Sequence, residues 1–449
     1  MLYSYSQGDG FLNPIKQKAQ HNGNSTKVFT CIVIVVLISQ FALHYTLFTY
    51  DGTREDQKSI FFDNGKDTFS DTFKVESYVI DRDPYCMEND SESIFDNSSY
   101  PAMANLIIYL LTPTESNFTL YSNYSMSIDN LALVRGMFFL MISSLLLYVS
   151  LERLFSLHKP ANKLLAGILP LALLFSGPFI YAFERGNILI FAIALTTFFL
   201  SGYKSENKLV RELSMLSLAL AASIKIVPAV FGLLMLLEKE YKATVRLVIY
   251  GLTFTVLPFL FFKGGFSAIP VFVSNLITPV AFYEFGYFPR LNYHYFTSYG
   301  GLISNKLTVF LWSFMPFCDK ALGIFSLASL PFLKKDWQKV ACLALPIIIL
   351  PSNSGTYNIL YLFPVLVLLL TDINKTSEKI IALAFLPMLT AMQYMCNYQI
   401  GKVTQFELTT IFENLISWGL FAYFGLMGMH IYINKLSIII SKKLNRHAS

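Results

Sequence analysis

The sequence has few charged residues for its length. Asp, Glu, Lys and Arg make up only 14% of the 449 residues, whereas 54% are hydrophobic and the mean hydropathy is +0.50. Soluble domains carry roughly 25% charged residues, which argues against a water-soluble protein. The apolar residues form stretches approaching the roughly 20 residues that a helix needs to cross a bilayer. They lack the strict alternation of membrane-spanning strands. The expected fold is therefore an all-α, polytopic transmembrane helical bundle.

Several signatures of soluble chemistry are also missing. The sequence contains no P-loop and no G-x-G-x-x-G fingerprint, so a soluble nucleotide-sugar site is not expected. Its five cysteines are too scattered for a disulfide framework, and no CxxC or His/Cys metal pattern occurs. The net charge of +5 is small and the basic residues are dispersed, which disfavours nucleic-acid binding. The internal repeats of many transporters are not visible either.

Basic residues between the apolar stretches predict the topology, because they favour the cytoplasmic side. We expect a cytoplasmic segment over 1–27, one transmembrane domain over 28–435 and a basic cytoplasmic tail over 436–449. About twelve crossings would leave both termini in the cytoplasm. A short hairpin over 213–237, turning at Lys225, would reconcile the basic residues at both of its ends. The other expected helices cover 28–48, 131–151, 164–183, 188–203, 245–262, a run from about 307, 340–350, 357–370, 380–394 and 412–433.

The first outer loop, residues 49–130, is strongly acidic, with 15 acidic residues against five basic ones. Acidic and aromatic residues alternate in D-T-F-S-D-T-F, which runs from Asp67 to Phe73, and an interfacial helix is expected over 101–111. A carboxylate beside aromatic faces at the lipid boundary is suited to gripping a sugar hydroxyl and removing its proton. The alternative is an acidic, solvated loop without a catalytic role.

Two further polar segments are expected on the same side. The turn Glu184, Arg185, Gly186 and Asn187 places a cation where an anionic head group would lie, and Lys225 would lie at the same depth. Alternatively, Glu184 and Arg185 pair with each other and Lys225 extends to the interface. In the second outer segment, residues 263–305, Tyr293 and His294 belong to a run dense in aromatics, which is also typical of an interface belt.

The order of these motifs resembles that of the GT-C membrane glycosyltransferases, and glycosyltransferase family 87 in particular. The resemblance covers about residues 28–375. It rests on D-x-F-x-D-x-F, R-D-P-Y, S-Y-P-x-x-A-N-L, E-R-G-N, A-A-S-I-K-I-V-P-A and P-S-N-S-G-T-Y-N, in that order after a first helix. The family is associated with polyprenyl-phosphate-mannose-dependent mannosyltransferases.

The resemblance implies an inverting transfer of a sugar from a polyprenyl-phosphate donor on the outer face of the plasma membrane. The acceptor would be a lipid-linked or cell-envelope glycan. The general base maps best to Asp71, with Asp67 as the second choice, because Thr72 and Lys74 depart from the family pattern. Arg185 and Lys225 match positions suited to the donor phosphate, and Tyr100 belongs to a family Y-P-P motif that reads Y-P-A here. No cofactor is implied, and no metal is required.

Two other functions remain open. A lipid-linked-glycan polymerase or ligase also combines a helical bundle with long outer loops, although basic residues would then be expected to dominate those loops. A transporter or flippase would instead place ionisable residues near the membrane midplane.

Overall fold

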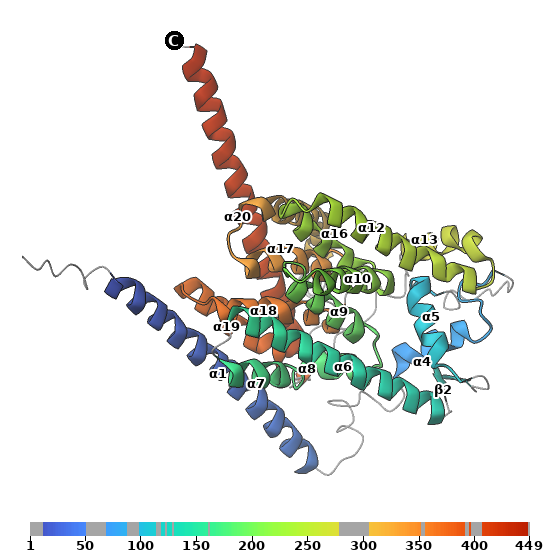
Figure 1. Cartoon of the computed structure of the whole chain (residues 1–449). Helices are drawn as coiled ribbons and strands as arrows, with labels where there is room; N and C mark the ends of the chain where they lie inside the picture. Colours follow the sequence, from blue (N-terminus) through green and yellow to red (C-terminus); the bar gives the residue numbers. More distant parts are fainter. Residues whose placement is uncertain are drawn as a thin grey trace, which may run out of the picture.

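The computed structural model shows a helical protein in which long and short helices alternate (Figure 1). Two short antiparallel strand pairs accompany the helices: β1 (Phe118–Tyr121) with β2 (Tyr124–Ser127), and β3 (Met395–Cys396) with β4 (Phe406–Glu407). The structure describes residues 12–50, 69–87, 98–113, 118–121, 124–127, 130–159, 162–277, 305–351, 355–390, 395–396 and 406–447.

Four helical segments in the described residues are long and apolar enough to cross a membrane, which agrees with a membrane protein. They lie in α1 (Leu12–Tyr50), α6 (Asn130–His158), α12 (Tyr241–Val256) continued by η2 (Leu257–Phe261), and α20 (Leu408–His447). A fifth is counted if α7 (Lys163–Leu173) and α8 (Gly177–Glu184) form one broken span. The twelve expected crossings and the sidedness of the loops remain predictions.

The remaining helices are not among these candidate spans. They are α4 (Ser70–Val79), α5 (Ala102–Leu111), α9 (Leu189–Gly202), α10 (Lys208–Ile224), η1 (Val227–Gly232), α11 (Leu233–Leu237), η3 (Gly265–Ala268), α13 (Ile269–Ile277), α16 (Asn305–Ser329), η4 (Leu330–Phe332), α17 (Asp336–Ile349), η5 (Thr356–Leu362), α18 (Phe363–Thr371) and α19 (Thr376–Leu389). The interfacial segment expected over 101–111 is helical as α5. The chain also breaks at Lys225, which caps the C-terminus of α10 in an extended conformation.

The single helix expected over 164–183 is wrong, because the chain forms two helices there, bent by 54°. Ser176 is extended and Pro178 stands in the first turn of α8. Proline cannot continue a helix as a hydrogen-bond donor but fits its first turn, so the sequence starts a new helix at this point. α8 therefore runs at an angle to α7 and ends at Glu184, directly before Arg185.

The carboxylate of Asp319, which interrupts the run from about 307, does not break α16. Its side chain is 2% exposed, and its Oδ1 accepts a hydrogen bond of 2.8 Å from Nε1 of Trp418 on α20. Polar groups across a helix pair in this way when lipid offers no partner.

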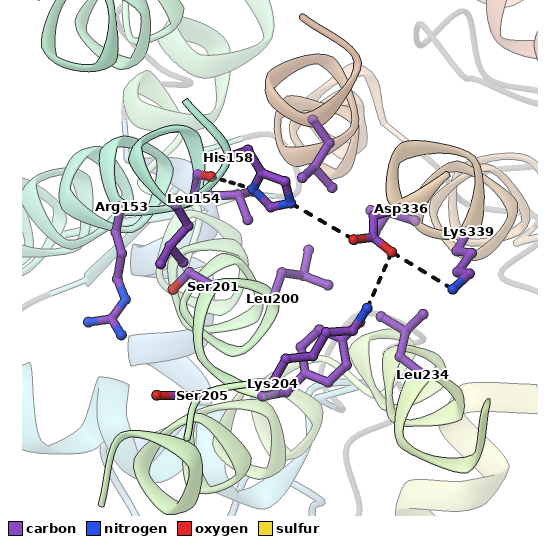
Figure 2. A pocket seen from close by; sticks show the side chains of 14 residues that line it. Arg153, Leu154, His158, Leu200, Ser201, Lys204, Ser205, Leu234, Asp336 and Lys339 are labelled. Carbon is purple, nitrogen blue, oxygen red and sulfur yellow. Dashed lines mark hydrogen bonds and ion pairs between the residues drawn. The ribbon is translucent and has the colours of Figure 1, made fainter. Parts of the chain in front are cut away.

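Charged side chains also join helix ends near the C-terminus of α6 (Figure 2). Asp336, in the first turn of α17, lies 3.3 Å from Nζ of Lys204 and 3.8 Å from both Nε2 of His158 and Nζ of Lys339. These contacts tie α6, the end of α9 and the start of α17 to one another.

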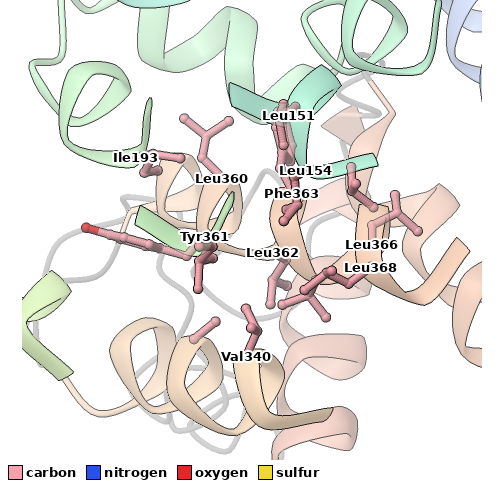
Figure 3. Close-up of a cluster of buried hydrophobic side chains, with 14 of the residues drawn as sticks. Leu151, Leu154, Ile193, Val340, Leu360, Tyr361, Leu362, Phe363, Leu366 and Leu368 are labelled. Atoms are coloured by element: carbon pink, nitrogen blue, oxygen red, sulfur yellow. The ribbon is translucent and has the colours of Figure 1, made fainter. Parts of the chain in front are cut away.

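The main core lies where α6, α9, η5, α17 and α18 meet (Figure 3). All nine residues of α18 are buried, and Leu151 and Leu154 of α6 pack beside Leu366 and Leu368. A helix that is apolar on every side is expected to be surrounded by other elements. In Figure 1, α6 runs from α4 and β2 at one end of the molecule towards α19 at the other. The charged cluster around Asp336 lies near the C-terminus of α6, away from the end that meets α4.

Candidate active site

The start of α4 is fixed against the turn between α8 and α9. The backbone N–H of Phe69 donates to the carbonyl of Glu184 at 2.7 Å, and that of Asp71 donates to the carbonyl of Arg185 at 3.0 Å. These bonds join segments that lie more than a hundred residues apart in the chain. They place the Asp71 side chain directly beside the turn expected to hold an anion.

Asp71 is held by the two polar side chains of this turn. Arg185 donates from Nε to Oδ2 at 3.2 Å and from Nη2 to Oδ1 at 2.8 Å, and Nδ2 of Asn187 donates to Oδ2 at 2.7 Å. Asn187 is itself fixed, because its Oδ1 accepts from the backbone N–H of Leu189 at the start of α9. Arg185 and Asp71 keep 12% and 17% of their side-chain surface exposed, so both are largely shielded from solvent.

These contacts set the protonation state of Asp71, which lies outside the candidate membrane spans. Burial raises the pKa of its carboxyl, but the charge of Arg185 and the hydrogen bonds from Arg185 and Asn187 outweigh burial. The charge of Lys225 acts in the same direction, and the pKa lies below its ordinary value. Asp71 is therefore an ionised carboxylate at neutral pH.

Thr72, which departs from the family pattern, forms a hydrogen bond to the turn. Its hydroxyl donates to the carbonyl of Gly186 at 2.5 Å, which adds another hydrogen bond between α4 and the turn. Gly186 has a φ of +68°, and a Cβ there would meet Oγ1 of Thr72 at 2.5 Å and the Cα of Phe69 at 3.2 Å. A glycine is therefore required at this position by both conformation and space.

Lys225 and Tyr100 form the second part of the site. Nζ of Lys225 lies 4.3 Å from the centroid of the Tyr100 ring, within the range of a cation–π contact. The structure thus brings Arg185 and Asn187 into contact with Asp71 and places Lys225 near enough for its charge to act on that carboxylate, while their roles in catalysis remain a proposal.

A buried polar cluster binds the backbone carbonyl of Tyr100 and so holds this residue in place. The backbone carbonyl of Tyr100 accepts from the Tyr85 hydroxyl at 3.0 Å and from Nδ2 of Asn105 at 3.3 Å. Nδ2 of Asn105 also donates to the Tyr85 hydroxyl at 3.1 Å, and its Oδ1 accepts from Ser98 at 3.1 Å. Sequence reasoning used Tyr85 and Asn105 only as motif letters in R-D-P-Y and S-Y-P-x-x-A-N-L. The position of Asn105 as a single amide within the apolar run 101–111 was the available signal for a buried, structural role.

The remaining expected site residues are Glu184, Asp67, Tyr293 and His294. Glu184 is 7% exposed and contributes its backbone carbonyl to the contact with Phe69. Asp67, Tyr293 and His294 lie outside the described residues. Among the residues that the structure describes, no group of three or more His, Cys, Asp or Glu side chains could hold a metal ion. Whether the reaction needs a metal stays a prediction.

The comparison with protein families supports the expected resemblance. Residues 131–283 match the model of glycosyltransferase family 87. The matched segment is about a third of the chain and contains the Glu184–Asn187 turn and Lys225, whereas Asp71 and Tyr100 precede it. No curated protein and no solved structure matches the chain. The family match and the apolar helices together support a glycosyltransferase of the membrane.

Proposed function

We propose that the protein is an inverting membrane glycosyltransferase that moves a sugar from a polyprenyl-phosphate donor to a lipid-linked or cell-envelope glycan. The donor sugar would be mannose or another hexose or pentose, and the reaction would take place on the outer face of the plasma membrane. The observation that carries this proposal is the contact of Asp71 with Arg185 and Asn187, beside Lys225. It combines an ionised carboxylate with two cations in a chain whose 131–283 segment matches a glycosyltransferase family.

In the proposed reaction, an acceptor hydroxyl attacks the anomeric carbon of the donor sugar. Asp71 takes the hydroxyl proton, the new oxygen–carbon bond forms, and the bond from the anomeric carbon to the phosphate oxygen breaks. Polyprenyl phosphate leaves with the bonding electrons. Arg185 and Lys225 stabilise its charge, so no general acid is required. One carboxylate suffices, in contrast to the carboxylate pair of most glycoside hydrolases.

The hydrogen bonds seen here suggest an order of events. Arg185 and Asn187 together give Asp71 three hydrogen bonds, which weaken it as a base. A donor phosphate competes with the carboxylate for the Arg185 guanidinium, because the planar guanidinium can donate two hydrogen bonds to either anion. Phosphate binding would draw Arg185 away from Asp71 and restore an accepting oxygen for the acceptor hydroxyl. The donor would therefore bind before the base becomes active.

The test is sugar transfer by membranes that contain the full chain, assayed with a panel of radiolabelled polyprenyl-phosphate sugars and a crude glycolipid acceptor fraction. The proposal predicts a product with the anomeric configuration opposite to that of the donor, as determined by configuration-specific glycosidases. A matched panel of nucleotide sugars should give no product in the presence of an inhibitor of polyprenyl-phosphate-sugar synthesis. Transfer from a nucleotide sugar alone, or retention of configuration, would overturn the proposal.

A further inference from the structure

A second polar site lies at the other end of α6. Its cavity has a volume of about 260 Å³ and is walled mainly by aliphatic side chains, with charged groups at its rim (Figure 2). Thr72 and Phe69 of the candidate active site approach Gly136 near the start of α6, whereas Arg153 of this cavity lies 17 positions further on. At 1.5 Å per residue, the two sites are about 26 Å apart along the helix. This separation is close to the hydrocarbon thickness of a bilayer, roughly 30 Å.

The rim of the cavity is positively charged. Arg153, Lys204 and Lys339 are permanent cations, and Asp336 is the one carboxylate among the lining residues. Lys204 also pairs at 3.1 Å with Glu238, which does not line the cavity. With His158 counted as neutral, the three cations exceed Asp336 and Glu238 by one positive charge. An anion is the ligand that complements such a rim.

Arg153 is the cation that these internal pairs leave unused. In Figure 2 its side chain extends on the far side of the cavity from Asp336, with Leu154 and Leu200 between them. Its guanidinium lies 5.7 Å from the Phe198 ring centroid, and its buried Nε has no hydrogen-bond partner among the described residues. A buried donor without a partner is costly unless a ligand satisfies it.

The apolar walls of the cavity are suited to a ligand that has an apolar part beside its anionic group. Leu157, Leu200 and Leu234 line the cavity, and Leu157 is 57% exposed, so the cavity opens towards an apolar outer face of α6. Basic pockets between membrane helices, at the membrane face where basic residues gather, are suited to the head groups of anionic phospholipids. Lys159 follows α6, and Lys163 and Lys208 begin α7 and α10 at this same end, consistent with the positive-inside rule.

We infer that this cavity binds the head group of an anionic phospholipid, with the phosphate at the Arg153 guanidinium and a chain leaving past Leu157. The site is separate from the candidate active site and does not depend on the proposed sugar transfer. Its occupant would tie α6, α9 and α17 together at the face opposite Asp71. The alternative, in which the ion pairs alone serve this purpose, predicts no lipid selectivity.

The test measures the melting temperature, Tm, of the purified, delipidated full chain in detergent. Phosphatidylglycerol should raise Tm by about 3 °C or more, because a ligand that binds only the folded state stabilises it. Phosphatidylcholine with the same acyl chains should give less than half of this rise. Inorganic phosphate at the same concentration should give none, and a full rise with phosphate alone would overturn the lipid assignment.

Variants locate the site. Arg153→Gln should lose most of the phosphatidylglycerol effect, and the double variant that adds Lys339→Gln should lose at least as much. Arg211→Gln removes a cation that pairs with Glu240 outside the cavity, and this control should keep the effect. Leu157→Glu places a negative charge at an exposed position of the mouth and should abolish the effect, whereas Leu157→Gln should retain most of it. An unchanged lipid effect in Leu157→Glu, or in the folded double variant, would overturn the inference.

Discussion

Arg185 contacts both oxygens of the Asp71 carboxylate, although 114 residues separate the two in the chain. The contact depends on the position of Arg185 directly after the last residue of α8, and on the hydrogen bonds that align the start of α4 with the same turn. In the proposed reaction, Arg185 also binds the donor phosphate. The same side chain would therefore stabilise the leaving group and control how strongly Asp71 acts as a base.

The pH dependence of transfer follows from the low pKa of Asp71. A base must be deprotonated to act, and a pKa below the ordinary value of about 3.8 keeps Asp71 ionised from pH 7 down to about pH 5. We expect kcat/KM to show no acid limb in that range. Asn187→Asp keeps the oxygen that accepts from Leu189 but adds a second negative charge beside Asp71, so the pKa rises and the acid limb moves to higher pH. An identical pH profile for wild type and variant would contradict this account of the base.

Gly186 tests the link between α4 and the turn. Gly186→Ala forces a side chain into a left-handed conformation and against Thr72, which we expect to cost about 1–2 kcal/mol and to displace Asp71. Both Tm and kcat should fall. Gly251→Ala is the control, because nothing lies within 4 Å of its Cβ position and its backbone is helical. If Gly186→Ala and Gly251→Ala behave alike, the close approach at Gly186 is not important.

Lys225 should act on donor binding. Lys225→Gln removes a charge-assisted contact worth about 1.5–3 kcal/mol, which corresponds to at least a tenfold rise in the donor KM. Lys225→Arg should recover part of the loss. Tyr100→Leu removes only the aromatic face beside Nζ and leaves the charge of Lys225 in place, so it should give a smaller rise. Steady-state kinetics with varied donor and fixed acceptor would measure this, and an unchanged donor KM in Lys225→Gln would exclude the assigned role.

The cluster around Asn105 should affect stability rather than chemistry. Asn105→Ala removes three hydrogen bonds and leaves the buried Ser98 and Tyr85 hydroxyls short of a partner, at a cost of about 2–3 kcal/mol. Tyr85→Phe removes two of the bonds in this cluster and should cost less. Thermal unfolding would show a larger fall in Tm for Asn105→Ala than for Tyr85→Phe, with an unchanged pH profile of transfer in the protein that remains folded. The reverse order of Tm values would argue against Asn105 as the centre of the cluster.

The sequence predicted the helical class, the break at Lys225 and the side chains that meet Asp71. Those predictions succeeded because charge placement and motif order carry information along the chain. The sequence did not predict the bend at Pro178, because an apolar run of 20 residues gives the same hydropathy whether the helix is continuous or broken. It also could not show that Thr72 donates to Gly186, since that bond depends on the packing of segments 114 residues apart. The cavity beside Arg153 was missed for the same reason: its lining comes from five separate parts of the chain.

The most direct test of the central claim is sugar transfer from a polyprenyl-phosphate donor by membranes with matched amounts of wild type, Asp71→Asn, Asp67→Asn and Asp81→Asn. Asp81 is an exposed carboxylate ten positions after Asp71 and serves as the control. The account predicts that Asp71→Asn lowers the transfer rate by about 10²–10⁴-fold, the usual contribution of a general base. Asp67→Asn and Asp81→Asn should remain active. Wild-type transfer that persists in Asp71→Asn and disappears in Asp67→Asn would contradict the assignment of Asp71 as the base.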